Sequence, residues 1–286
     1  MRERIACALL ALALLGAGGC GRAPEEKPAA GAPAANLPPS LDGAIDAEKA
    51  LALLYGPYDA KLKAAHWRSP GPDGKDADAM QVSPLLAQTV REGESERFYL
   101  ATAVVPENPE EPFDCEGCAP SVGLSVFLRT GERWVLESHA PELFDAGMNG
   151  HPPSARLVAT GAARYDVLFE WSFGNRGVTE NFAQLAGRGE RGPAKLFSLR
   201  TASENGGDCG ADTSFGAPCY AYEIELAFSP VPQAQRHEIR ATAKGSFVDY
   251  TDEKKQARKL DGTAVYRFNG TKYALVSRPR DWPEDE

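Results

Sequence analysis

The stretch Gly-Leu-Ser-Val-Phe-Leu-Arg-Thr-Gly-Glu-Arg-Trp-Val-Leu-Glu-Ser, residues 123–138, reads as two short apolar strands around a Thr130-Gly131 turn. A second stretch, Gly-Thr-Ala-Val-Tyr-Arg-Phe-Asn-Gly-Thr-Lys-Tyr-Ala-Leu-Val-Ser, residues 262–277, aligns with it without gaps and turns at Asn269-Gly270. Asn-Gly is a strong hairpin signal because both central residues of the turn need a positive φ. Each stretch therefore predicts a β-hairpin. The similarity has two possible explanations: one unit was duplicated, or two unrelated hairpins meet the same steric demands.

Similar runs occupy most of the chain from residue 97 onward. They are short and separated by Gly, Asn, Asp or Pro, with no helical period between them. This spacing is typical of antiparallel strands and not of βαβ units. We predict strands over residues 97–105, 121–129, 132–138, 154–160, 164–173, 177–185, 193–200, 219–228, 235–249, 263–268 and 271–276.

The segment 41–95 has a different pattern and predicts short helices. An Ala- and Leu-rich helix is expected from Ala47 to Tyr55, where Gly56-Pro57 ends it. Candidate N-caps are Ser40, Asp42 and Asp46. Further helices are expected over residues 58–67 and 83–93. The predicted fold class is mainly β (α+β overall), with these helices followed by an antiparallel β-sandwich or propeller-like body of about ten short strands.

The first 19 residues read as a removable secretory signal peptide. Arg2 and Arg4 precede an uncharged run from Ile5 to Gly19 that ends in small residues. The run is too short to span a bilayer, which takes about 20 apolar residues. A buried core helix is the competing interpretation, but a polar, Pro-rich stretch follows at once.

The end of this run, Leu-Gly-Ala-Gly-Gly-Cys-Gly at residues 15–21, resembles the bacterial lipobox. Small residues before Cys20 fit the family pattern, whereas Ala17 stands where Leu is usual. The resemblance implies cleavage before Cys20 and attachment of lipid, with palmitate, to this cysteine. In that family Gly21, in place of Asp, implies the periplasmic face of the outer membrane.

The mature chain is then expected to begin with a tether. Residues 22–40 hold five prolines and six alanines, so they have few side chains able to build a core. About 20 residues in an extended polyproline conformation reach roughly 60 Å. The predicted organisation is a signal peptide (1–19), a lipidated cysteine and tether (20–40), a helical region (41–95) and a β-rich body (96–286). Alternatively, residues 41–286 form one domain.

The charge balance argues against nucleic acid as a partner. From Cys20 onward the chain has 29 basic and 39 acidic residues, a formal net charge of −10. Proteins that bind nucleic acid need a basic face, because phosphate contacts dominate their affinity. The membrane is therefore expected as a partner only through the lipid.

Four cysteines remain after processing, in two close pairs: Cys115 with Cys118, and Cys209 with Cys219. An even set in an oxidising compartment is typical of disulfides, and three connectivities are possible. We favour the two local pairs, since each closes a loop rich in turn-forming residues. The Cys-x-x-Cys spacing also occurs in redox and zinc sites, but four carboxylates crowd it and no helix begins there to stabilise a thiolate.

Other motifs are weak. Gly187, Gly189 and Gly192 match G-x-G-x-x-G, but a strand-like run follows, so we predict a flexible hairpin loop in which Arg188 and Arg191 are candidates to hold an anion. The stretch 205–212 offers oxygen ligands for calcium, yet its spacing favours a disulfide-closed turn. Serine-hydrolase and zinc-protease motifs are missing, and no catalytic residue, cofactor or metal ligand is predicted.

The stretch 164–200 contains Asp-Val-Leu-Phe-Glu-Trp, Gly-Asn-Arg-Gly-Val-Thr-Glu and Phe-Ser-Leu-Arg-Thr. It is similar to uncharacterised β-rich periplasmic proteins of bacteria, which implies an envelope location and no mechanism. The sequence thus leads us to expect a non-enzymatic, lipid-anchored envelope module that binds or supports another envelope protein or polymer. The alternative is an envelope-polymer hydrolase that uses a carboxylate pair.

Overall fold

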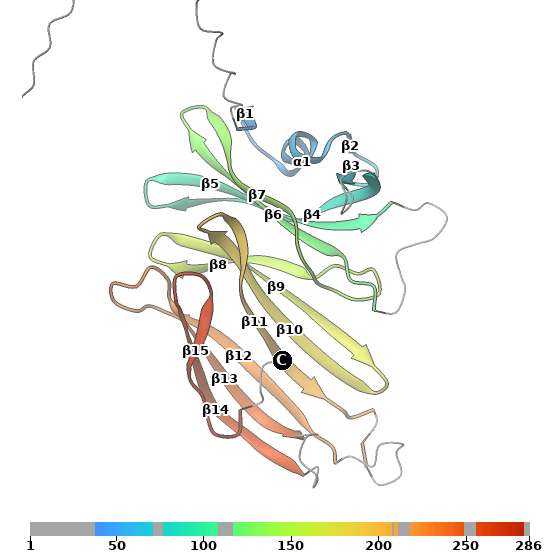
Figure 1. Ribbon diagram of the computed structural model, residues 1–286, viewed down its shortest axis with the longest axis vertical. Helices are drawn as coiled ribbons and strands as arrows, with labels where there is room; N and C mark the ends of the chain where they lie inside the picture. Colours follow the sequence, from blue (N-terminus) through green and yellow to red (C-terminus); the bar gives the residue numbers. More distant parts are fainter. Residues whose placement is uncertain are drawn as a thin grey trace, which may run out of the picture. The chain divides into compact units, whose positions relative to one another are not determined.

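The computed structural model describes residues 38–70, 77–107, 117–207, 209–210, 218–248 and 256–282. The predicted signal peptide, Cys20 and the predicted tether as far as Leu37 lie outside the described residues, and so does Cys115. Described strands form two antiparallel sheets, so the prediction of a mainly β sandwich is confirmed, and the propeller-like alternative is not found (Figure 1).

Each sheet is built from strands that follow one another along the chain. In spatial order the first sheet contains β1 (Ser40–Asp42), β7 (Arg133–Asp145), β6 (Ser121–Thr130), β5 (Ser95–Pro106), β4 (Ala77–Glu92), β3 (Ala64–Pro70) and β2 (Tyr58–Asp59). The second sheet contains β15 (Tyr273–Ser277), β14 (Ala257–Phe268), β13 (Glu238–Val248), β12 (Ala221–Ser229), β11 (Gly192–Glu204), β10 (Val178–Gly189), β9 (Arg164–Asn175) and β8 (Ser154–Gly161).

Both predicted hairpins are present, in different sheets. The hairpin of β6 and β7 lies inside the first sheet, where Thr130 pairs with Arg133 across the turn and Gly131 has φ +63°. The hairpin of β14 and β15 forms one margin of the second sheet, with Phe268 paired to Tyr273. Whether they descend from one duplicated unit stays a hypothesis.

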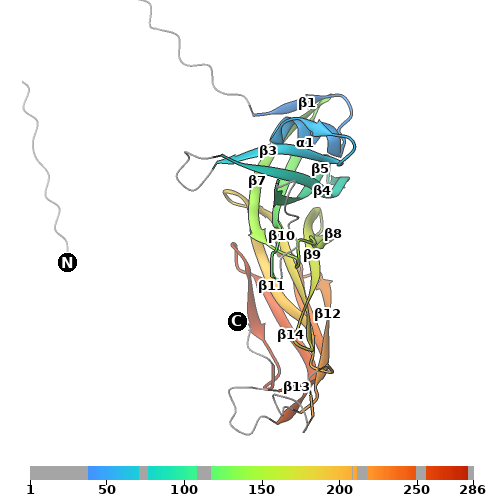
Figure 2. The same ribbon diagram turned by 90° about the vertical axis from the view of Figure 1, so that its right-hand side faces the viewer.

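The helix α1 (Ala47–Tyr55) covers one face of the first sheet, as Figures 1 and 2 show. Of the candidate caps, Asp46 is the one that acts, because its carboxylate accepts a hydrogen bond of 2.9 Å from the backbone N–H of Lys49. The buried Leu51 packs with side chains of the sheet such as Phe98 and Phe127. No helix in the described ranges is long and apolar enough to cross a membrane.

The two other helices expected near the N-terminus are wrong. Residues 58–67 turn at Lys63, where φ is +54°, and form β2 and β3. Residues 83–93 belong to β4, whose ladder with β5 shifts register between Pro84 and Leu86. A bulge accommodates a proline within a strand, and pairing with the buried strand β5 overrides the helix-start signal of Ser83-Pro84.

A shared core lies between the two sheets. Successive side chains of β5 point to opposite faces, so Tyr99 and Ala101 are buried on the side away from α1. There they cluster with Val167 and Phe169 of β9 in the second sheet. The sheets therefore bury apolar surface against each other through β5, β6, β9 and β10.

The second sheet also encloses a core of its own. Strands β11 and β12 pair only from Ala202 to Glu204, opposite Ala221 to Glu223. Beyond this short ladder the two halves of the sheet are joined by side chains, and the ring of Phe197 in β11 lies 5.0 Å from that of Tyr266 in β14. The arrangement brings the β12–β13 connection against β8, where the N–H of His237 donates to the carbonyl of Thr160 at 2.6 Å.

Candidate functional site

Cys209 and Cys219, predicted as a pair, form a disulfide with Cα atoms 4.8 Å apart. Cys118 is also disulfide-bonded, while its predicted partner, Cys115, lies outside the described residues. Because Cys209 and Cys219 are bonded to each other, they have no thiolate to offer to a zinc ion. Beside this disulfide, the Asn205 side chain accepts from the N–H of Tyr220 at 2.8 Å, so its oxygen ties the turn together.

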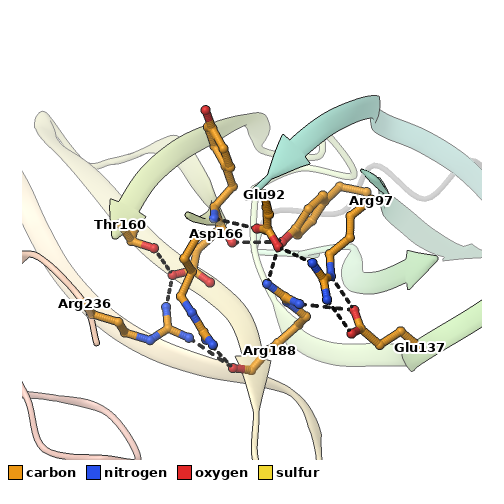
Figure 3. A network of polar contacts seen from close by, with 10 residues as sticks. Glu92, Arg97, Glu137, Thr160, Asp166, Arg188 and Arg236 are labelled. Carbon is orange, nitrogen blue, oxygen red and sulfur yellow. Dashed lines mark hydrogen bonds and ion pairs between the residues drawn. The ribbon is translucent and has the colours of Figure 1, made fainter. Parts of the chain in front are cut away.

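The densest cluster of charged side chains lies where the two sheets meet, and we call it the junction network. Its members are Glu92, Arg97, Tyr99, Glu137, Thr160, Tyr165, Asp166, Arg188 and Arg236 (Figure 3). They come from β4, β5 and β7 of the first sheet, from β8, β9 and β10 of the second, and from the β12–β13 connection. Sequence reasoning singled out only Arg188 among them.

Glu92 is the centre of the network. Its side chain is 1% exposed, and its Oε1 accepts 2.8 Å hydrogen bonds from the Tyr99 hydroxyl and from the backbone N–H of Tyr165. Its Oε2 lies 3.0 Å from Arg97 and also contacts Arg188. Both oxygens are therefore filled by donors, two of which come from the second sheet.

Glu137 shares both arginines with Glu92. Arg97 binds it in a two-pronged contact, with Nε and Nη2 at 2.9 and 3.0 Å from the two carboxylate oxygens, and Arg188 adds a contact of 3.2 Å. Burial raises the pKa of Glu137, but the hydrogen bond from Arg97 and the charge of Arg188 outweigh it and hold the pKa below its usual value. Glu137 is therefore ionised at neutral pH.

A second buried pair continues the network inside the second sheet. Asp166 is fully buried and contacts Arg236, whose side chain is also fully buried. Thr160 donates a 2.5 Å hydrogen bond to the same carboxylate, and Nη2 of Arg236 donates to the backbone carbonyl of Arg188 at 3.0 Å. Burial, followed by the charge of Arg164, lowers the pKa of Arg236 to about 10, so it still carries its charge at neutral pH.

The glycines of the Gly-Arg-Gly-Glu-Arg-Gly stretch fit this network and no nucleotide. Gly187 and Gly189 belong to β10, and Gly189 pairs directly with Gly192 across the turn. A side chain at Gly187 would place its Cβ 1.8 Å from the Oδ1 atom of Asp166. Arg188 itself contacts Glu92 and Glu137, so the anion that it holds is supplied by the protein's own carboxylates.

The junction network does not have the chemistry of a carboxylate-pair hydrolase. Glycoside hydrolysis needs one carboxyl group that stays protonated near neutral pH and a second one that faces substrate. Here Glu92, Glu137 and Asp166 are each paired with arginines, namely Arg97, Arg188 and Arg236, and Glu92 and Asp166 are buried. The arrangement joins the two sheets through charge-assisted hydrogen bonds.

A serine–histidine contact also proves to be structural. The hydroxyl of Ser125 lies 2.9 Å from Nδ1 of His139, and the ring of Tyr55 stacks edge-on against the imidazole at 5.6 Å. Burial lowers the pKa of His139, so it is neutral at pH 7. Because Ser125 is fully buried beneath α1, its hydroxyl is out of reach of a substrate.

One surface groove does bring two carboxylates together. It has a volume of about 480 Å³ and lies across β10 to β13, where β11 and β12 pair. Its lining residues include Asn181, Glu204, Tyr222, Glu223 and Lys244. Glu204 and Glu223 occupy diagonal positions of the β11–β12 ladder and are exposed.

No family model, curated protein or solved structure matches this chain.

Only part of this site had a signal in the sequence. The Gly-Arg-Gly-Glu-Arg-Gly stretch predicted a flexible hairpin loop with Arg188 and Arg191 as candidates to hold an anion, but it did not predict which anion. The ion pairs of Glu92 with Arg188 and of Asp166 with Arg236 carried no signal, because their members are 96 and 70 residues apart in the sequence. The nearer partners, Arg97 and Thr160, formed no recognisable motif with them. Spacing along the chain reports pairs within one element and not pairs between sheets.

Proposed function

We propose that this chain is a lipid-anchored protein of the cell envelope that binds or supports another envelope protein or polymer without catalysing a reaction. One observation carries the proposal: Glu92 and Glu137 are neutralised by arginines where the two sheets meet, and Asp166 is neutralised by Arg236 inside the second sheet. The junction network therefore joins the two sheets to each other. Such a body is suited to present its surfaces to a partner.

Anchoring is proposed through a lipid on Cys20, at the periplasmic face of the outer membrane. The lipobox-like stretch at residues 15–21 supports it, and the lipid is the only membrane attachment that the sequence predicts. Replacing Cys20 with Ser should move the protein from the membrane to the soluble fraction and abolish incorporation of a palmitate analogue. Unchanged labelling of Cys20→Ser would overturn the anchor.

Binding is tested by crosslinking the lipidated protein in its own host, followed by purification of the adducts. A specific adduct that recurs and depends on the folded body supports the proposal. A protein that forms none, and that instead degrades envelope polymer, would contradict it.

The second candidate function, an envelope-polymer hydrolase, is favoured by the groove that contains Glu204 and Glu223. Purified protein would be incubated with dye-labelled envelope polymer and the soluble dye measured. For a hydrolase, Glu204→Gln or Glu223→Gln should abolish release, whereas Glu132→Gln, on the exposed β6–β7 turn of the other sheet, should not. The non-enzymatic proposal expects no release from any of these proteins.

A further inference from the structure

The strand β15 leaves one edge of the second sheet open. It pairs with β14 on one side, through Phe268 with Tyr273 and Tyr266 with Leu275, and no described strand pairs with its other side. The hairpin that ends in β15 is closed by the N–H of Asn269, which donates to the carbonyl of Lys272 at 3.0 Å. In an antiparallel ladder, alternate residues direct their N–H and C=O groups away from the partner strand. This edge can therefore accept a further strand.

The open edge is apolar in a way that strand edges usually are not. Leu275 is 40% exposed and Val276 is 54% exposed, and they are two of the three exposed large hydrophobic residues among those described. Proteins commonly protect such edges with charged residues or proline. Residues 273–277, Tyr-Ala-Leu-Val-Ser, contain neither. At the opposite margin of the sheet, β8 carries Arg156, which pairs with Glu170 at 3.0 Å.

The surroundings of this edge are basic, although the chain as a whole is acidic. Among the described residues 269–282, which include β15 and its flanks, Lys272, Arg278 and Arg280 are basic and Asp281 is acidic, a formal charge of +2 compared with −9 for the entire chain. Lys272 and Arg280, which flank β15, are both exposed. An acidic partner is therefore attracted to a sheet margin where backbone groups and apolar side chains are open.

From these observations we infer that β15 is the docking site for an extended acidic segment of an envelope protein, which adds a strand to the second sheet. The inference rests on the binding role proposed above and names its partner class. Main-chain hydrogen bonds to β15 supply affinity, contacts with Leu275 and Val276 bury apolar surface, and acidic side chains select the basic margin. A second copy of this chain is disfavoured, because symmetric antiparallel pairing centred on Leu275 sets Lys272 opposite Arg278 of the copy.

The test uses the full chain with Cys20→Ser, which keeps it in solution, and a synthetic peptide of alternating Glu and Val residues. Binding is measured by fluorescence anisotropy, and backbone protection at residues 273–277 by hydrogen exchange. The expected result is salt-sensitive binding with slower exchange confined to β15 and the adjoining turn. The same peptide methylated at every amide nitrogen should not bind, because it cannot donate to a strand edge.

Charge variants test the selection. The double variant Lys272→Glu with Arg280→Glu should weaken binding about tenfold, because attraction becomes repulsion. Lys61→Glu, which changes an exposed lysine in the turn between β2 and β3, is the control and should bind as the parent does. Both variants change exposed side chains, and circular dichroism verifies that they fold.

Several results would overturn the inference: equal binding of the methylated peptide, equal binding of the double variant, or protection elsewhere than β15. Binding to phosphatidylglycerol vesicles but not to the peptide would also overturn it, since an anionic surface would then be the ligand. These failures are distinct from failure of the proposed function, which is decided by polymer degradation and by adducts formed in the host.

Discussion

The guanidinium of Arg188, at the end of β10, contacts the carboxylate of Glu92, at the end of β4, and so an ion pair joins the two sheets. The side chains are 14% and 1% exposed, respectively. Removing charges from water costs several kcal/mol per ion, and opposite charges and hydrogen bonds offset this cost. Both carboxylate oxygens of Glu92 have such partners, whereas Oδ1 of Asp166 and the Nε atoms of Arg188 and Arg236 have no hydrogen-bond partner among the described residues. The junction network therefore makes correct docking of the sheets a condition for burying its charges.

Replacing Glu92 with Gln should lower the free energy of unfolding by about 3 kcal/mol, because Arg97 and Arg188 lose a buried carboxylate. Urea denaturation measures the change. Glu96→Gln is the control, since Glu96 and Arg129 form an ion pair of 2.7 Å with both side chains more than 40% exposed. That change should cost less than about 1 kcal/mol. An equal loss of unfolding free energy in the two variants would show that the buried ion pairs of the junction network contribute no more than an exposed ion pair.

Glu137 should make stability depend on pH in the acid range. Its folded pKa lies below the usual 4.5, so its contribution to stability is complete above that value and is lost as the pH falls through the folded pKa. The urea midpoint of the parent should therefore decrease below about pH 4.5 more steeply than that of Glu137→Gln. Parallel midpoint curves for the two proteins would contradict this prediction.

Gly187→Ala should be destabilising, because the new Cβ would lie 1.8 Å from the Oδ1 atom of Asp166. Overpacking of this kind costs about 1–3 kcal/mol. Gly174→Ala is the matched control in the neighbouring strand β9, where the nearest atom, the carbonyl oxygen of Val178, is 4.0 Å from the added Cβ. Thermal unfolding of the two variants compares them, and a similar shift in both would rule out the predicted clash.

Removal of β1 should weaken the first sheet. A chain that begins at Gly43 loses the pairing of Leu41 with Trp134 and the 2.9 Å hydrogen bond from the N–H of Leu136 to the carbonyl of Pro39. We expect it to be less stable by about 2 kcal/mol than a chain that begins at Pro38, because it lacks the partly buried Leu41 side chain that packs against the core of the first sheet as well as the β1 pairing. Near-UV circular dichroism and urea denaturation of the two chains measure the effect, and equal stability would contradict it.

The sequence predicted correctly those elements whose local preference for helix, strand or turn matches the structure they adopt in the fold. The hairpins at residues 123–138 and 262–277 have turn residues and alternating apolar side chains, and both form. The helix Ala47–Tyr55 begins after a good cap and ends before Gly56, and it also forms. The helix predicted over residues 83–93 is wrong. Ser83-Pro84 resembles the start of a helix, but pairing with β5 makes this segment part of a bulged strand.

The sequence by itself determined the β-rich class, the two hairpins, the first helix and the local disulfide between Cys209 and Cys219. These depend on φ preferences, side-chain period and short loops, which neighbouring residues specify. Only the tertiary structure decided that Glu92 meets Arg188 and that Asp166 meets Arg236. It also decided that β15 is left at an open margin. Such relationships depend on which strand lies beside which, and a buried ion pair between distant strands leaves no periodic trace along the chain.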